Sequence, residues 1–206
     1  MRFAVLLAAA LCTGCMPVVQ HGPWVHRGYS GSLGASGGAS TELDGPATIQ
    51  PFFSFEGGMR VGITPADSSH EGASIGVQLP LLSVLAALDA SEDAPFAFLQ
   101  FLQLEGYVTA PRVGGLHTAA GLTASNFHYM PYVQAGRYDD WYSTVALMVA
   151  RDPDFMMIAP SYTTVARSSP GTLRHVTLTA GVGTTGDETL FMAGFTLIFE
   201  FHRVRP

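Results

Sequence analysis

Regular alternation of apolar and polar side chains is the feature of this sequence that most restricts its fold. Between Thr189 and Phe201 every second residue is apolar, and the row includes four phenylalanines. A helix would distribute these rings around its circumference, whereas a strand places them on one face. We therefore predict a β-strand over 189–201. When tilted it is long enough to cross a bilayer, which requires about 9–11 residues.

The same alternation recurs along the chain from Trp24 onward, broken by short stretches rich in Gly, Pro, Asp and Asn that are typical of turns. The clearest further strands are predicted at 53–63, 73–81, 102–108, 116–122, 145–149 and 176–182. The pattern predicts an all-β fold: a single antiparallel up-and-down β-barrel of about 8–10 strands. We expect this barrel to be transmembrane.

Composition indicates which face of the strands points outward. Hydrophobic residues make up 48% of the chain, charged residues only 13%, and lysine is absent. Ordinary soluble domains carry about 25% charged residues, which cover their wet surface. The polar rows here consist mainly of Ser, Thr, Gly and Gln, which suit a narrow lumen. We therefore expect the apolar rows to face lipid. A soluble, lipocalin-like barrel that binds an apolar ligand is the alternative, because it alternates too.

The amino terminus has the pattern of a secretory signal. A short basic start is followed by an apolar stretch, residues 3–11, that is too short to span a membrane. We predict a signal peptide over 1–14, a tether over 15–23, the barrel over 24–201 and a C-terminal tail over 202–206. The small residues before Cys15 resemble the lipobox of bacterial lipoproteins. That resemblance implies acylation of Cys15 and an outer-membrane destination.

As a whole, residues 24–201 resemble small bacterial outer-membrane β-barrel proteins in pattern and composition. The resemblance implies outer-membrane lipid and the barrel-assembly machinery as partners. An even strand number would place both termini at the periplasmic side, where a lipid on the amino terminus would insert. Aromatic residues near strand ends would form interfacial girdles; the candidates are Trp24, Tyr29, Phe52, Trp141, Tyr162 and Phe201. The net charge of −6, with no basic stripe, argues against a nucleic-acid partner.

Some polar side chains of the inward rows are large or charged, and inside a narrow barrel they must pair or be hydrated. We predict a luminal polar network made of Glu56, Arg60, Gln103, Glu105, His117, Gln134, His175 and Glu200. Its expected role is structural, and the alternative is a path for a small solute or lipid. Because the histidines are dispersed and no cofactor motif is present, we expect no metal and no cofactor.

Catalysis is the remaining functional class. Some outer-membrane barrels modify lipids with a serine, a histidine and an acid near the membrane surface. The best candidates here are Ser125 and His128, with His117 and Asp139 elsewhere in the sequence. Their spacing matches no known motif, so we expect a non-enzymatic barrel, porin-like at most. A deacylase-like or acyltransferase-like enzyme is the alternative.

Overall fold

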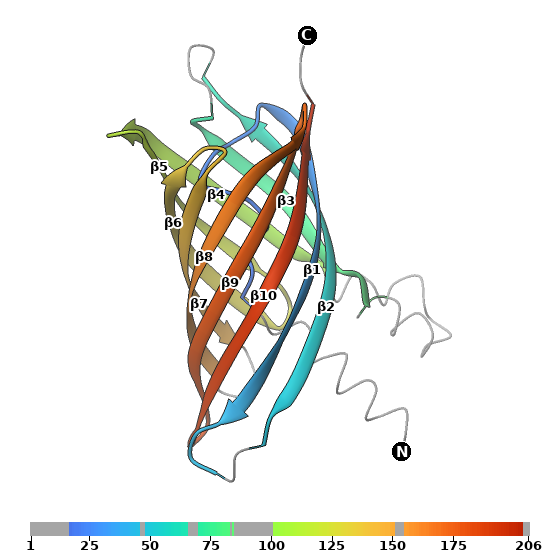
Figure 1. Ribbon diagram of the computed structural model, residues 1–206, viewed down its shortest axis with the longest axis vertical. Coiled ribbons are helices and arrows are strands. Elements are labelled where there is room, and N and C mark those ends of the chain that lie inside the picture. Colours follow the sequence, from blue (N-terminus) through green and yellow to red (C-terminus); the bar gives the residue numbers. More distant parts are fainter. Residues whose placement is uncertain are drawn as a thin grey trace.

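The protein is described by a computed structural model over residues 17–45, 48–65, 70–82, 84, 101–150 and 155–203. These residues form ten antiparallel strands closed into one barrel (Figure 1). The strands are β1 (Gly28–Glu42), β2 (Gln50–Ile63), β3 (Ala73–Pro80), β4 (Gln103–Val113), β5 (Leu116–Ala124), β6 (His128–Arg137), β7 (Trp141–Ala150), β8 (Phe155–Ser169), β9 (Thr172–Thr185) and β10 (Glu188–His202). The prediction of a single antiparallel barrel is confirmed, and the strand number is ten. No helix in the described part of the chain is long and apolar enough to span a membrane.

Closure depends on pairing between the first and last strands. β1 lies between β2 and β10, and every other strand pairs with its sequence neighbours. The β1–β10 ladder is regular from Ser30 opposite His202 to Glu42 opposite Leu190. A closed ladder leaves no free sheet edge, so the backbone groups of all the strands find partners within the wall.

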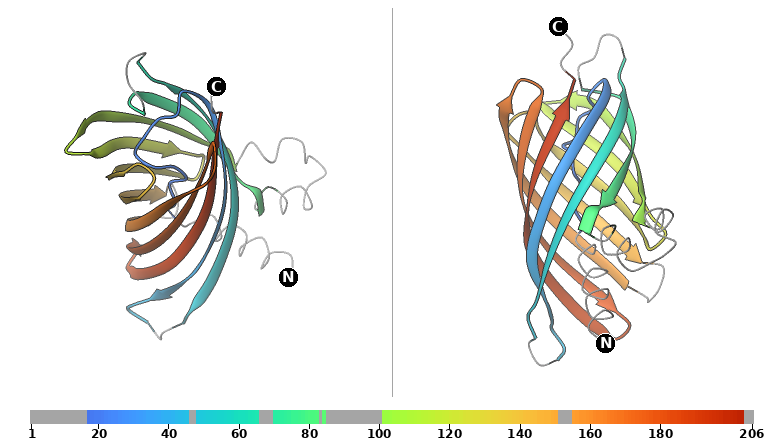
Figure 2. Two further views of the ribbon diagram at one scale, coloured as in Figure 1. Left: turned by 45° about the horizontal axis from the view of Figure 1, so that its top comes forward. Right: turned by 90° about the vertical axis from the view of Figure 1, so that its right-hand side faces the viewer.

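The two ends of the barrel differ (Figure 2). β1 starts and β10 finishes at the end that we call the terminal end, where the β4–β5, β6–β7 and β8–β9 connections are two or three residues long. The opposite end, the loop end, receives the β1–β2 connection and the longest one, residues 81–102 between β3 and β4. The terminal end also carries the nine-residue β2–β3 connection (64–72), and the loop end carries the two-residue β9–β10 connection, so the ends share short and long connections.

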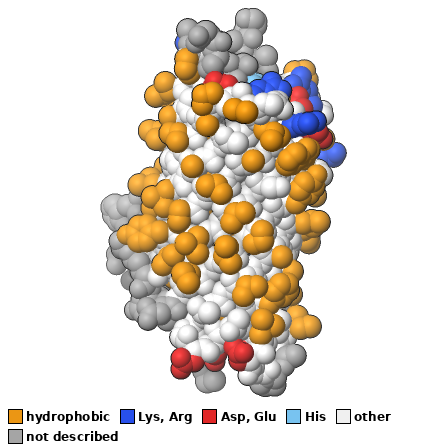
Figure 3. All heavy atoms as spheres, turned by 90° about the vertical axis from the view of Figure 1, so that its left-hand side faces the viewer, with side chains coloured by type: hydrophobic (Ala, Val, Ile, Leu, Met, Phe, Trp, Pro, Cys, Tyr) orange, Lys and Arg blue, Asp and Glu red, His pale blue; other side chains and the backbone are white. Residues whose placement is uncertain are grey.

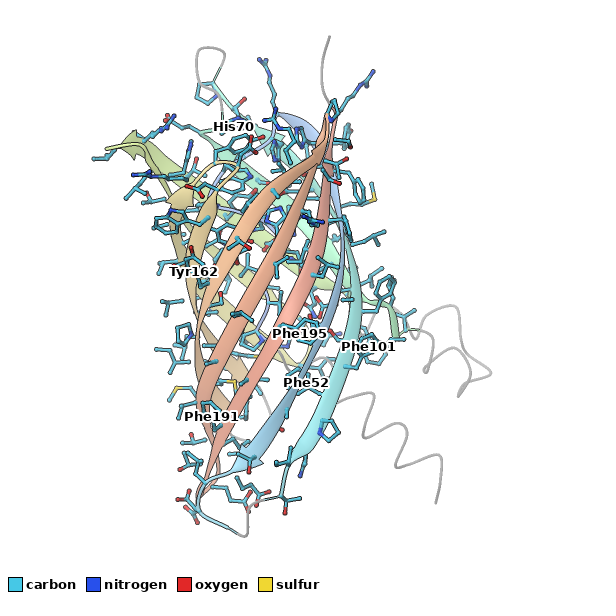
Figure 4. The ribbon with its side chains drawn as sticks, in the orientation of Figure 1. Phe52, His70, Phe101, Tyr162, Phe191 and Phe195 are labelled. Atoms are coloured by element: carbon cyan, nitrogen blue, oxygen red, sulfur yellow. The ribbon has the colours of Figure 1, made fainter. Side chains whose placement is uncertain are left out.

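The outer wall is apolar. All ten strands contribute exposed large hydrophobic side chains, such as Leu178 at 63% exposure and Phe195 at 57%. Figure 3 shows these side chains spread over the wall between the two ends, and Figure 4 places Tyr162, Phe191 and Phe195 on it. The predicted orientation, apolar rows outward and polar rows inward, is confirmed by this burial pattern.

Charged side chains are confined to the lumen and to the two ends. Among the described residues, every charged side chain outside the lumen lies in a connection or within two residues of a strand end. Six exposed arginines belong to the terminal end, namely Arg27, Arg112, Arg137, Arg167, Arg174 and Arg203. The loop end instead carries Glu42, Asp44, Asp187 and Glu188. There, hydrogen bonds from Thr189 lower the pKa of Asp44.

The start of the described chain lies inside the barrel. Residues 17–26 are all buried, and the chain leaves the lumen at Arg27 before β1 begins (Figures 1 and 2). Residues 17–23 therefore do not form the predicted tether, because their apolar side chains are shielded by the barrel. Trp24 is likewise not a girdle residue but a luminal one, with 0% exposure. Phe52 also points inward and packs among buried side chains.

A glycine makes the sharp change of direction from the lumen into the wall. Gly28 has φ of 85°, a left-handed conformation that favours glycine. It is the first residue of β1 and directly follows Arg27. The predicted signal peptide and Cys15 precede Pro17 and lie outside the described residues.

Inward-facing glycines create space for large luminal side chains, and Gly121 offers a test. A Cβ atom at Gly121 would lie 2.3 Å from the ring of Tyr132, whereas one at Gly106 would meet only the Ser74 carbonyl at 4.0 Å. We expect Gly121→Ala to lower the free energy of unfolding by about 1–3 kcal/mol, as overpacking of a filled interior does. Urea unfolding in detergent micelles measures the difference. Gly106→Ala is the control, and equal effects of the two substitutions would contradict this packing.

Candidate functional site in the barrel lumen

Residues 17–27, which we call the luminal segment, run from the loop end to the terminal end of the lumen. Val18 belongs to a buried cluster with Met157 and Met192, which lie toward the loop ends of β8 and β10. At the other end, the ring of His26 stacks on that of His202, the last residue of β10, with centroids 3.9 Å apart. The segment is therefore a plug that extends through the barrel.

Side chains of the wall bind the backbone of the luminal segment. The Gln134 amide donates a hydrogen bond to the His21 carbonyl (2.9 Å), and the Tyr107 hydroxyl donates one to the Trp24 carbonyl (3.0 Å). The Val25 N–H donates to the carbonyl of His70 (2.9 Å) in the β2–β3 connection. A buried backbone needs such partners, and here the wall provides them without extending the sheet.

Glu56 on β2 is one of three buried carboxylates that face the segment. Its Oε2 accepts a hydrogen bond of 2.5 Å from Gln20, and its Oε1 accepts one of 3.2 Å from Ser54. Ser32 on β1 donates to the other end of the Gln20 amide (2.8 Å). None of the ion pairs formed by the described residues includes Glu56, so neutral donors alone stabilise it.

Glu105 on β4 is the most extensively bonded carboxylate. Its Oε2 accepts hydrogen bonds from Arg60 (2.7 Å) and Gln78 (3.0 Å). Its Oε1 accepts one from the Tyr132 hydroxyl (3.1 Å) and lies 3.2 Å from Nε2 of His21. The Nδ1 of His21 donates to the Gly22 carbonyl (2.7 Å). Four side chains from three strands and the segment thus converge on one carboxylate, which is the arrangement a buried charge needs.

Glu200 on β10 is the third carboxylate and lies nearer the terminal end. It contacts Nε2 of His175 at 3.1 Å and Nε2 of His26 at 3.6 Å. The Tyr142 hydroxyl lies 3.2 Å from the other ring nitrogen of His175 and fixes the ring. His26 belongs to the luminal segment. All three luminal carboxylates therefore have a segment side chain beside them: Gln20 at Glu56, His21 at Glu105 and His26 at Glu200.

Aromatic rings close the lumen at the terminal end. Tyr138 in the β6–β7 turn stacks on His70 (4.2 Å between centroids) and meets Trp24 edge-on (5.0 Å). Figure 4 shows His70 at this end of the barrel. Burial, followed by the nearby His117 and His202, lowers the pKa of His70 below its usual value. These rings therefore form an uncharged cover near neutral pH, with the buried Trp24 beneath it.

The structure brings most of the predicted luminal residues together. Seven of the eight are buried inside the barrel: Glu56, Arg60, Glu105, His117, Gln134, His175 and Glu200. Gln103, at the start of β4 opposite Gln78, is only half-buried. Their functional role remains a proposal.

The sequence analysis missed the partners that the luminal segment contributes. Gln20 and His21 fall in the predicted tether, and Trp24 and His26 fall in the predicted barrel, with Trp24 as a girdle candidate. One signal could have revealed them: residues 16–26 contain no Asp, Glu, Lys or Arg. Such a stretch with a tryptophan fits a buried position better than a solvated linker.

The four candidate catalytic residues are not brought together as a set. Ser125 in the β5–β6 connection lies beside His128, the first residue of β6, at the loop end, whereas His117 and Asp139 lie near the terminal end. The Ser125 hydroxyl is 3.2 Å from Nδ1 of His128, but it also accepts hydrogen bonds from the N–H groups of Phe127 and His128. This hydroxyl stabilises a turn.

The described residues include no group of three or more His, Cys, Asp or Glu side chains placed to bind a metal ion. The luminal histidines stack on other rings or face carboxylates instead. His26 and His202, for example, are parallel within 4°.

Comparisons with known proteins show only a distant likeness in structure. The attachment invasion locus protein Ail of Yersinia pestis aligns with 85% of this chain and 100% of its own, at 8% identity and a TM-score of 0.32. The KdgM porin aligns with 84% of this chain and 99% of its own, at 8% identity and a TM-score of 0.33. At these values neither likeness carries an argument about function. No protein-family model matches the sequence, and no curated protein does.

The Arg60–Glu105 pair is expected to stabilise the barrel. Glu105→Ala leaves the Arg60 guanidinium buried without its carboxylate, which costs about 3–5 kcal/mol for such a group. Unfolding in urea, followed by tryptophan fluorescence, measures the loss. The matched control is Asp139→Ala, which breaks the more exposed Arg167–Asp139 pair and is expected to cost about 0–1 kcal/mol. Equally small losses would show that Glu105 does not support the fold.

Proposed function

We propose that this protein is an integral outer-membrane β-barrel, non-enzymatic, whose lumen is closed by its own amino-terminal segment. Its role is structural, or it provides a narrow passage for a small solute or lipid once the segment moves. The observation that carries the proposal is the distribution of charge. In the described residues no charged side chain lies on the middle of the outer wall, although three carboxylates and an arginine lie inside.

This distribution is opposite to that of a soluble barrel. A lipocalin-like protein encloses an apolar ligand and exposes a charged surface to water. Here the interior is rich in hydrogen-bonding groups, and the exterior exposes Phe, Leu, Val and Ile on every strand. A continuous apolar exterior of this extent requires lipid around it.

The start of β1, the finish of β10 and three short turns lie at the same end, which supports an orientation in the membrane. Membrane barrels usually place short turns and both strand termini in the periplasm and longer loops outside. By that rule the arginine-rich terminal end faces the periplasm and the acidic loop end faces the cell exterior. The barrel-assembly machinery and outer-membrane lipid are its expected partners.

The proposal includes a signal peptide over 1–14 and acylation of Cys15. The course of the luminal segment changes where such a lipid would insert. Pro17 is buried and precedes Val18, which packs in a cluster toward the loop end. Two residues of chain reach at most about 7 Å. The acyl chains on Cys15 would therefore enter the leaflet at the loop end, and not the periplasmic leaflet that the sequence suggested.

Membrane insertion is tested by gel mobility and by one substitution on the outer wall. We expect the outer-membrane fraction to contain a band that resists SDS and shifts only on boiling. Leu178→Arg should destabilise the barrel in a bilayer by about 2–4 kcal/mol, because the charge lies in the hydrocarbon region. Leu43→Arg is the control, since Leu43 is exposed beyond the end of β1. A soluble barrel would show no band shift and would tolerate Leu178→Arg.

Acylation is tested by metabolic labelling with radioactive palmitate. The full chain should incorporate label, and Cys15→Ser should abolish it. Cys12→Ser provides the matched control, because Cys12 would leave with the signal peptide and its loss should not change the labelling. Equal labelling of the Cys15→Ser variant and the unmodified chain would exclude acylation at this position.

A further inference from the structure

We propose that the luminal segment is a displaceable plug, and that the barrel conducts small cations when the plug leaves. This inference rests on the proposed function, because it requires a barrel that spans a membrane. Three observations support it: the way the segment is attached, the wall against which it lies, and the charge that it covers.

The segment is held by side-chain contacts and isolated backbone hydrogen bonds, and not by strand pairing. Residues 17–27 belong to no strand, so no ladder of backbone hydrogen bonds joins them to the wall. The wall itself is closed by the continuous β1–β10 ladder, in which the segment takes no part. Withdrawal would therefore break individual side-chain contacts and leave the sheet intact.

Two wall positions beside the segment are glycines, Gly58 and Gly62. A Cβ atom at Gly62 would lie 2.1 Å from the His26 carbonyl oxygen, and one at Gly58 would lie 3.4 Å from the Gln20 amide. An extended chain has a cross-section of about 5 by 10 Å, as the spacings of packed strands show. Its departure would leave a continuous space that water and small ions can enter.

The charge of the uncovered wall favours cations. The strands contribute the carboxylates of Glu56, Glu105 and Glu200 to the lumen, and Arg60 is the one buried arginine among the described residues. The luminal segment contributes no acid; it contributes His21, His26 and Gln20, which face those carboxylates. Without the segment, Glu56 keeps only Ser54 of its two hydrogen-bond donors, and the acidic groups outnumber the remaining arginine. A narrow pore with excess carboxylate attracts cations and repels anions.

The experiment uses the full chain, folded before the plug is released. Arg27 is exposed and precedes Gly28, so trypsin can separate the segment from β1 after insertion. In planar bilayers with a KCl gradient, the intact protein should show little conductance. Trypsin should raise the conductance several-fold. The reversal potential should have the sign expected for a pore that passes K⁺ in preference to Cl⁻. Arg27→Gln, treated in the same way, is the matched control for cuts at other arginines and should stay closed.

Two further variants test the plug and the cation preference separately from the protease. Trp24→Ala removes the largest buried side chain of the segment and should raise conductance without protease. Glu56→Gln in that background should reduce the preference for K⁺. If trypsin cuts at Arg27 and the band stays heat-modifiable, but neither the cut nor Trp24→Ala raises the conductance, the plug proposal is wrong. The membrane-barrel proposal would not be affected by that result. Loss of the heat-modifiable band in the untreated protein would instead refute the membrane barrel itself.

Discussion

Closure of the sheet between β1 and β10 is the interaction on which the rest of this structure depends. Strand backbones in hydrocarbon have no water to bind, so a sheet edge cannot persist there. The ladder from Ser30–His202 to Glu42–Leu190 removes both edges at once. Closure also divides each strand into an outer, apolar face and a face toward the lumen. Every polar side chain of the inward rows must then find its partners inside.

The luminal segment completes that interior. The wall alone offers three carboxylates and one arginine, an imbalance that is costly in a confined space. His21, His26 and Gln20 bring hydrogen-bonding groups to these carboxylates, while Val18 and Val19 fill the apolar part of the lumen near the loop end. Stability and closure thus have the same origin. A group that stabilises a luminal carboxylate also blocks the path past it, and its removal would change both properties together.

Much of the barrel, including which side chains face the lumen, could be predicted from the alternation of apolar and polar residues alone. The inward placement of Glu105 and Glu200 follows from their position between apolar neighbours on a strand, because successive side chains point to opposite faces. The partners do not follow from it. Glu105 meets Arg60 from β2 and His21 from the segment, 45 and 84 residues away in sequence. Trp24 was mistaken for a girdle residue, because a tryptophan next to the first strand suits a membrane interface and a lumen equally well.

The sequence by itself determined that the chain is a closed antiparallel barrel with apolar residues outside. It did so because strand periodicity is local, and because so few charged residues cannot cover a wet surface. Only the tertiary structure decided that the amino-terminal segment enters the lumen and runs from the loop end to the terminal end. The segment has no periodicity, and its position depends on long-range contacts with Tyr107, Gln134 and His70. Those contacts exist only once the wall that carries them has closed.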